Sequence, residues 1–139
     1  MNRRSDAEKL SLEIPSEIKY IRKVSSGILE WLKPRDLDDS ALFDIRLCVE
    51  EVVRNAITHG NNDDKSLKVI VNYWLEGDSL IVEVEDEGQG FDLDKVPDPT
   101  IGENLMRGSG RGVYLIRKLV DKMELNDRGN KVKLTKYLK

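Results

Sequence analysis

Glu51 and Asn55 form the pair of side chains in this sequence with the clearest chemical potential. They lie four residues apart in the run EEVVRNAITHG, residues 50–60, and in a helix this separation places both on one face. A carboxylate beside a carboxamide can accept a proton from a hydroxyl group and can hold a hard cation through oxygen. The alternative is a hydrogen-bonded pair on the helix surface. Glu50 and Arg54 have the same spacing, and we interpret them as an exposed ion pair.

A second segment, residues 86–91 with the sequence DEGQGF, follows an alternating run that predicts a strand. Its glycines, Gly88 and Gly90, allow positive φ angles and let a ligand approach the main chain closely. Asp86, at the end of the expected strand, can accept a hydrogen bond from an exocyclic amine. The alternative interpretation is an ordinary turn.

A third segment directly precedes an expected helix and consists of Gly108, Ser109, Gly110, Arg111 and Gly112. Alternate glycines expose main-chain N–H groups, and the helix N-terminus adds the positive end of its dipole, so the segment suits phosphate. The alternative is a flexible linker before the helix. The segment is not a P-loop, because no Gly-Lys-Ser/Thr follows. It is not a dinucleotide fingerprint either, because no strand leads directly into it.

The elements that position these segments are expected from hydrophobic periodicity and turn residues. Alternation predicts strands over residues 9–15, 67–75, 79–86, 123–125 and 131–138. Helical periodicity predicts helices over residues 18–32, from Asp38 or Asp39 to about His59, and from about 110 to 122. Residues 87–109 show no regular period, and a loop this long in a compact domain is usually functional or mobile.

The expected order, β-α-α-β-β-α-β-β, contains two adjacent hairpins and favours a mixed, largely antiparallel sheet. With three helices on one face, the expected fold class is α/β (α+β), a two-layer sandwich. This order does not fit the alternating βαβ pattern of a doubly wound fold. A length of 139 residues allows one domain with a real core, so we expect a single domain over residues 1–139.

The composition excludes several classes of protein and site. Cys48 is the single cysteine and His59 the single histidine, which excludes an intrachain disulfide and a structural zinc site and favours a reducing cytoplasm. No apolar run approaches the ~20 residues of a membrane span, and the first residues lack the apolar core of a signal peptide. A net charge of −3 and a pI near 5.3 argue against a general nucleic-acid binder.

The charge is unevenly distributed along the chain. Residues 1–106 hold 13 basic and 23 acidic side chains, a net charge of −10, whereas residues 107–139 hold 10 and 3, a net charge of +7. We interpret the basic third as the solvated face of a helix and a strand, and the alternative is a site for an anionic ligand.

Together, the three segments resemble the motifs of the GHKL ATP-binding superfamily, and within it those of the small anti-sigma factor kinases of bacterial partner-switching systems. The N box is matched by Glu51, Asn55, Ala56, His59 and Gly60. The G1 box is matched by Asp86, Gly88 and Gly90, and the G2 box by Gly108, Gly110 and Gly112. The resemblance extends from about residue 10 to residue 139 and implies the Bergerat ATP-binding fold.

The resemblance implies a role for each matching residue. Asn55 would ligate the Mg²⁺ ion that bridges the ATP phosphates, and Glu51 would act as the general base. Asp86 would bind the amino group of adenine, while Gly88 and Gly90 would let the main chain pass close to the nucleotide.

For the remaining positions, the resemblance implies a role shared by a whole segment, leaves the role open, or is not matched by this sequence. Residues 108–112, with Ser109 and Arg111, would wrap the phosphates as part of an ATP lid whose variable portion is residues 91–107. His59 would be either a pocket wall or a helix C-cap. Many superfamily members have a threonine after the glycine of the last hairpin, where this chain has Asn130.

The implied activity is that of an ATP- and Mg²⁺-dependent serine/threonine protein kinase that releases ADP. Its implied partners are an anti-anti-sigma protein of the STAS type, which it phosphorylates, and a sigma factor, which it sequesters. A homodimer is also implied, with no direct binding of nucleic acid or membrane. The alternative is a non-catalytic nucleotide-binding module that binds partner proteins. A histidine kinase lacks support because no dimerisation helix with a phospho-accepting histidine is present, and a gyrase or MutL-type ATPase needs a larger transducer domain.

Overall fold

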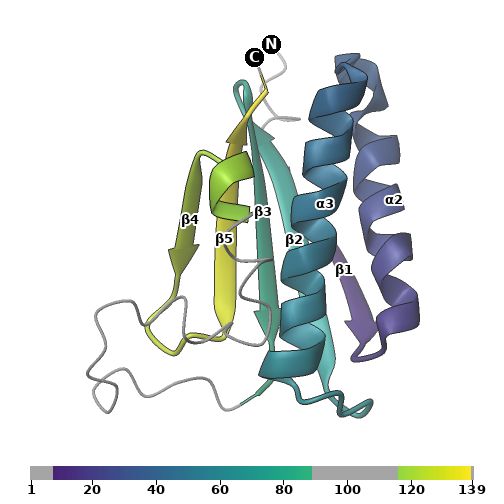
Figure 1. Cartoon of the computed structure of the whole chain (residues 1–139), viewed down its shortest axis with the longest axis vertical. Coiled ribbons are helices and arrows are strands. Elements are labelled where there is room, and N and C mark those ends of the chain that lie inside the picture. Colours follow the sequence, from purple (N-terminus) through teal and green to yellow (C-terminus); the bar gives the residue numbers. More distant parts are fainter. Residues whose placement is uncertain (1–7, 89–115, 139) are drawn as a thin grey trace.

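The computed structural model describes residues 8–88 and 116–138, which form two layers (Figure 1). The strands of the sheet are β1 (Leu10–Pro15), β2 (Lys68–Glu76), β3 (Ser79–Asp86), β4 (Lys122–Leu125) and β5 (Lys131–Tyr137). Their order across the sheet is β1-β2-β3-β5-β4, and each neighbouring pair is antiparallel. The expected two-layer α+β fold is confirmed.

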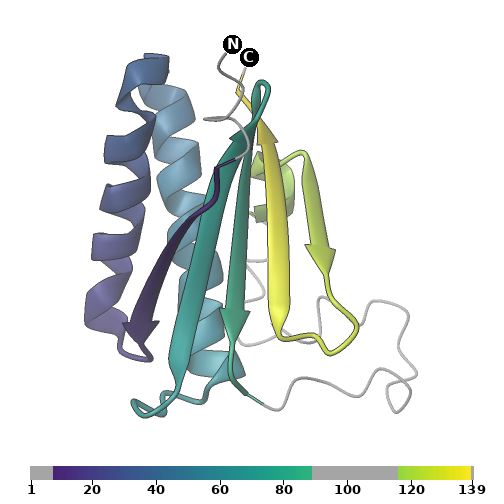
Figure 2. The same cartoon turned by 180° about the vertical axis from the view of Figure 1, so that it is seen from behind.

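Two long helices, α2 (Ile21–Leu32) and α3 (Asp39–Asn55), lie side by side on one face of this sheet. The view from behind shows the opposite face, which carries no described helix (Figure 2). A 3₁₀ turn, η1 (Ile18–Tyr20), leads into α2, and another, η2 (Lys33–Arg35), follows it. Within the described ranges, no helix is long and apolar enough to cross a membrane.

The second helix begins and ends with specific hydrogen bonds. Asp38 is its N-cap, and the Asp38 carboxylate accepts a hydrogen bond from the Ala41 N–H at 2.8 Å. The sequence pattern predicts one helix to about His59, and the chain is helical that far. The last turn, η3 (Ala56–Gly60), is however a wider π-helical turn, in which the Asn61 N–H reaches back to the Ala56 carbonyl at 2.8 Å.

The third expected helix is shorter at its C-terminal end than the periodicity predicts. Residues 116–119 are helical, whereas residues 110–115 lie outside the described residues. The predicted end at Lys122 is wrong, because Lys122 begins β4 and pairs with Thr135 of β5. The Asp121 N–H already donates to the Thr135 carbonyl at 2.9 Å, so the strand ladder replaces the helical hydrogen bonds there.

The hairpin between β2 and β3 fixes the register of the central strands. Glu76 pairs with Ser79, which leaves a two-residue turn whose first residue is Gly77 at a φ of 60°. A positive φ at this position suits glycine and matches the twist of the flanking strands.

The core lies between the helices and the covered face of the sheet. Its fully buried side chains include Val24, Ile28, Leu32, Ile45, Val49, Val52, Val53, Val69, Val71 and Val84. Cys48 is buried among them, and burial raises the pKa of its thiol to about 12, so the thiol stays protonated and packs as a small apolar group.

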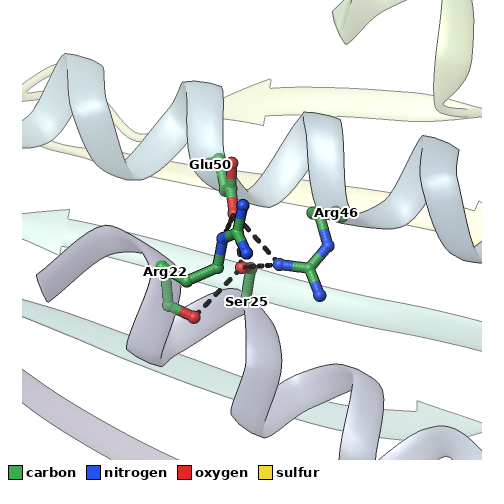
Figure 3. A network of polar contacts seen from close by, with 4 residues as sticks. All are labelled: Arg22, Ser25, Arg46 and Glu50. Carbon is green, nitrogen blue, oxygen red and sulfur yellow. Dashed lines mark hydrogen bonds and ion pairs between the residues drawn. The ribbon is translucent and has the colours of Figure 1, made fainter.

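A polar bridge joins α2 to α3 at the edge of this core (Figure 3). The buried Ser25 hydroxyl donates to Oε2 of Glu50 at 2.6 Å and accepts from Nη1 of Arg46 at 3.0 Å. The same Glu50 oxygen lies 3.3 Å from Nη1 of Arg46 and 3.5 Å from Nε of Arg22. The expected Glu50–Arg54 ion pair is therefore wrong, because Glu50 turns toward α2, where it finds a buried hydroxyl and two guanidinium groups.

We predict that Ser25→Ala lowers the free energy of unfolding by about 1–2 kcal/mol, because it removes a short charge-assisted hydrogen bond from a buried site. Ser26→Ala, at the next and exposed position of α2, is the matched control and corrects for the helix propensity of alanine. Urea unfolding of the two variants measures the difference. Equal stability of the two variants would contradict this role for Ser25.

Candidate functional site

A pocket of about 640 Å³ lies where η3, the C-terminal end of β3 and the β4–β5 turn meet. In Figure 1 this is the lower end of α3 and β3. The helical side contributes Val52, Asn55, Ala56, His59 and Gly60, and the β3 side contributes Val84, Asp86, Glu87 and Gly88. Leu125, Gly129 and Val132 close the side next to β4 and β5. The N-box and G1-box residues within the described ranges thus meet at one cavity, apart from Glu51.

Asp86 is the buried carboxylate of this pocket, with 8% of the residue exposed. Burial raises its pKa from 3.8 to about 6, while a hydrogen bond from the Gly88 N–H to Oδ1, 3.0 Å long, acts in the opposite direction. Arg128 also lowers the pKa of Asp86 through its charge. A desolvated acceptor of this kind is suited to a ligand that brings a hydrogen-bond donor.

Two glycines make room for this carboxylate. A Cβ atom on Gly60 would overlap the Asp86 carboxylate, and one on Gly88 would overlap the Gly60 carbonyl oxygen. The main chain of the helix end therefore packs directly against the Asp86 carboxylate and the Gly88 main chain, and a side chain at position 60 or 88 would push the two ends apart. The close approach expected for Gly88 is present, although its first neighbour is Gly60.

Asn55 is the last residue of α3 and lies on the pocket wall with 4% of its surface exposed. Its carboxamide oxygen is of the hard-donor type that Mg²⁺ accepts. Among the described residues, no group of three or more His, Cys, Asp or Glu side chains could hold a metal ion. Mg²⁺ commonly takes one or two protein ligands and completes its shell with phosphates and water, so this donor set fits a metal–nucleotide complex better than a free ion.

Glu51 lies one helical turn before Asn55 and does not contribute to the pocket wall. Its side chain is 23% exposed, and its Oε2 is 3.9 Å from Nε of Arg54. Glu51 is therefore at the margin of the site, on the same helix as Asn55.

The other expected positions divide into two groups. His59 is exposed and lines the pocket, whereas the C-cap position of η3 is occupied by Asn61. The expected lid lies outside the described residues, and with it Gly90, Gly108, Ser109, Gly110, Arg111 and Gly112.

Two asparagines that the sequence interpretation did not assign to the site support it. Asn61 lines the pocket with a buried side chain, and its only signal in the sequence is its place directly after the N box. Asn130 is also buried; its Nδ2 donates to the main-chain oxygen of Asp86 at 3.1 Å, and the Asp86 N–H donates to the Asn130 carbonyl at 2.9 Å. Asn130 therefore holds the main chain at the end of β3.

The raised pKa of Asp86 makes folding stability depend on pH. Between pH 3.8 and about 6 the folded chain keeps a proton on Asp86 that the unfolded chain has lost. The stability associated with protonated Asp86 is therefore fully present below pH 3.8 and is lost as the pH rises through about 6. At pH 7 the charged carboxylate opposes folding.

We predict that Asp86→Asn raises the free energy of unfolding at pH 7 by about 1–3 kcal/mol, because the carboxamide carries no charge to desolvate. The gain should shrink as the pH is lowered from 7 to 4, and urea unfolding at several pH values measures it. Glu83→Gln, on the same strand, is the control and should change stability by less than about 0.5 kcal/mol. A variant no more stable than the wild type at pH 7 would contradict this effect of burial.

Comparison with known proteins agrees with this geometry. The family model of the histidine kinase-like ATPase domain matches residues 14–136. The serine-protein kinase RsbW of Bacillus velezensis is 30% identical over 96% of this chain and 88% of its own length. RsbW of Bacillus subtilis is 29% identical over 97% and 89%, and RsbW of Listeria monocytogenes is 28% identical over 94% and 88%.

A crystal structure of the RsbU and RsbW domains of a Mycobacterium tuberculosis protein shares the fold. It aligns with a TM-score of 0.66 at 24% identity, over 95% of this chain. The chain spans about a third of that longer protein, 33% of its length. The match of the family model over most of the sequence and the meeting of the N-box and G1-box residues at one pocket lead to the same conclusion: the chain belongs to the histidine kinase-like ATPase domain family.

Proposed function

We propose that this chain is an ATP- and Mg²⁺-dependent anti-sigma factor serine/threonine protein kinase. The observation that carries the proposal is the convergence on one pocket of the buried Asp86 carboxylate, its two close glycines and the Asn55 carboxamide. The relatives named serine-protein kinase RsbW align over 94% to 97% of the chain, which supports the same activity.

Asp86 and Asn55, which both line the pocket, suit two different parts of a nucleotide. Asp86 can accept a hydrogen bond from the amino group of adenine, next to the main chain of Gly60 and Gly88. Asn55 can hold Mg²⁺, which when bound would neutralise charge on the ATP phosphates. By the family resemblance, residues 108–112 would supply N–H groups and the Arg111 charge to the phosphates.

In this proposal Glu51 is the general base and accepts the proton of the attacking hydroxyl. It lies on α3 one turn from Asn55, partly exposed, where a serine or threonine of a partner protein can reach its carboxylate. Phosphoryl transfer requires positioning and charge neutralisation more than covalent help, so this small set of groups is sufficient.

The proposed partners are a STAS-type anti-anti-sigma protein as the phosphorylated substrate and a sigma factor as the sequestered ligand. A non-catalytic nucleotide-binding module is the alternative, and the position of Glu51 outside the pocket wall is the observation that favours it.

We predict that Glu51→Ala lowers the rate of partner phosphorylation by a factor of about 10²–10⁴ and changes ATP affinity little, because a general base acts only on the transferred proton. Asn55→Ala should instead weaken binding of Mg-ATP itself. Radiolabelled phosphate transfer and calorimetric titration measure the two effects, with Glu30→Ala on the exposed side of α2 as the control. ATP binding by the wild type without any phosphoserine or phosphothreonine on a STAS partner would favour the non-catalytic module.

A homodimer is proposed as the assembled state. Among the described strands, β1 lies at an edge of the sheet with β2 as its neighbour, and an edge strand can pair with a second copy. We predict that sedimentation at micromolar concentration gives a species of twice 15.9 kDa. A single species of 15.9 kDa would contradict the dimer.

A further inference from the structure

Asn61 stands out because both polar atoms of its buried side chain form hydrogen bonds to separate parts of the chain. The residue is 1% exposed. Its Oδ1 accepts from the Glu87 N–H at 2.9 Å, and its Nδ2 donates to Oγ of Ser16 at 2.8 Å and to the Lys68 carbonyl at 3.0 Å. A buried amide with every polar atom satisfied has one strongly preferred position.

These bonds connect the end of the N-box helix to the strands around the pocket. Ser16 follows β1 and donates in turn to the Leu67 carbonyl at 2.8 Å, just before β2. Glu87 directly follows β3, and its side chain accepts from the Lys68 N–H at 2.8 Å. Asn61 therefore ties the start of β2 and the end of β3 to η3.

The π-helical turn determines where Asn61 can make these bonds. The Asn61 N–H donates to the Ala56 carbonyl, five residues earlier, rather than to the residue four earlier as in an α-helix. This wider turn brings Gly60 against the Asp86 carboxylate and Asn61 against the residue that follows Asp86.

These contacts orient the Asp86 carboxylate, because each of its two oxygens lies against a neighbouring residue. Oδ1 accepts from the Gly88 N–H, and Oδ2 faces Gly60. Asn130 holds the Asp86 main chain, so loss of the bond between Asn61 and Glu87 acts on the residues that follow. Glu87 and Gly88 can then move away from η3, and the Asp86 carboxylate loses the Gly88 N–H that orients it.

We infer that Asn61 is a positioning residue for base recognition: it holds Glu87 and Gly88 against η3 so that Asp86 distinguishes a purine with a 6-amino group from one without. The inference rests on the proposed binding of an adenine nucleotide. The inference goes beyond that proposed binding, because it assigns the preference for the 6-amino group to Asn61, a residue that does not itself contact the amino group.

The test compares ATP with purine riboside triphosphate, which keeps the ring system, ribose and phosphates but lacks the amino group. Dissociation constants for both are measured by calorimetry with Mg²⁺ on the full chain and on Asn61→Ala, Ser16→Ala and Asn72→Ala. Asn72 is the matched control, since it lies on β2 between Val71 and Tyr73, whose side chains face the core, and so belongs to the other face of the sheet.

The preference for ATP should fall about tenfold in Asn61→Ala, by a smaller factor in Ser16→Ala, and not at all in Asn72→Ala. The Glu87 amide should also exchange its hydrogen faster in Asn61→Ala, because it loses its acceptor. If Asn61→Ala weakens the binding of both nucleotides equally, or changes neither, the preference for ATP stays the same. That result would overturn the role of Asn61 alone.

Two further outcomes remain decisive. If Asn61→Ala does not fold, Ser16→Ala is judged by the same criterion, because it removes one partner of the Asn61 amide from outside the pocket. A wild-type chain that binds neither nucleotide would overturn the proposed function and this inference with it.

Discussion

Contact between the main chain of Gly60 and the carboxylate of Asp86 determines how the helical layer meets the end of β3 and so shapes the pocket. Gly60 ends the helical segment that begins at Asp39, and Asp86 ends β3, so this contact joins the two layers at one end. It requires glycine at position 60 and leaves a carboxylate buried at a cost to stability. The pocket forms where the end of the helical segment, without a side chain at Gly60, packs directly against the Asp86 carboxylate and the Gly88 main chain at the end of β3.

The helical segment from Asp39 to Gly60 serves two purposes at once. Its buried stripe, which includes Val49, Val52 and Val53, packs against the sheet and secures the helix by hydrophobic burial. The adjoining positions toward its end carry Asn55 and the π-helical turn, which face the pocket. π-helical turns are rare and frequently occur at functional sites, and here the turn brings two residues, Gly60 and Asn61, against the end of β3.

Much of the fold could be predicted from the sequence, because alternation and helical periodicity depend only on residues close together in the chain. Expected strand ends lie within one residue of those observed. Asp86 and Gly88, which the resemblance to the G1 box groups together, both line one pocket. The rest depends on contacts between distant segments. No periodicity distinguishes a π-helical turn from an α-helical one, and the Glu50 pairing depends on residues of a different helix. The end of the third helix is decided by the hydrogen bonds of β5, which a helical pattern cannot indicate.

The proposal that Asp86 makes this pocket an adenine nucleotide site can be tested by a calorimetric titration of the wild type and of Asp86→Ala with Mg-ATP. The wild type should bind one ATP per chain. Asp86→Ala should remain folded and bind ATP at least about tenfold more weakly, because the amino group loses a charged acceptor. Equal affinity of the folded variant and the wild type would contradict the claim, since the buried carboxylate would then have no part in binding.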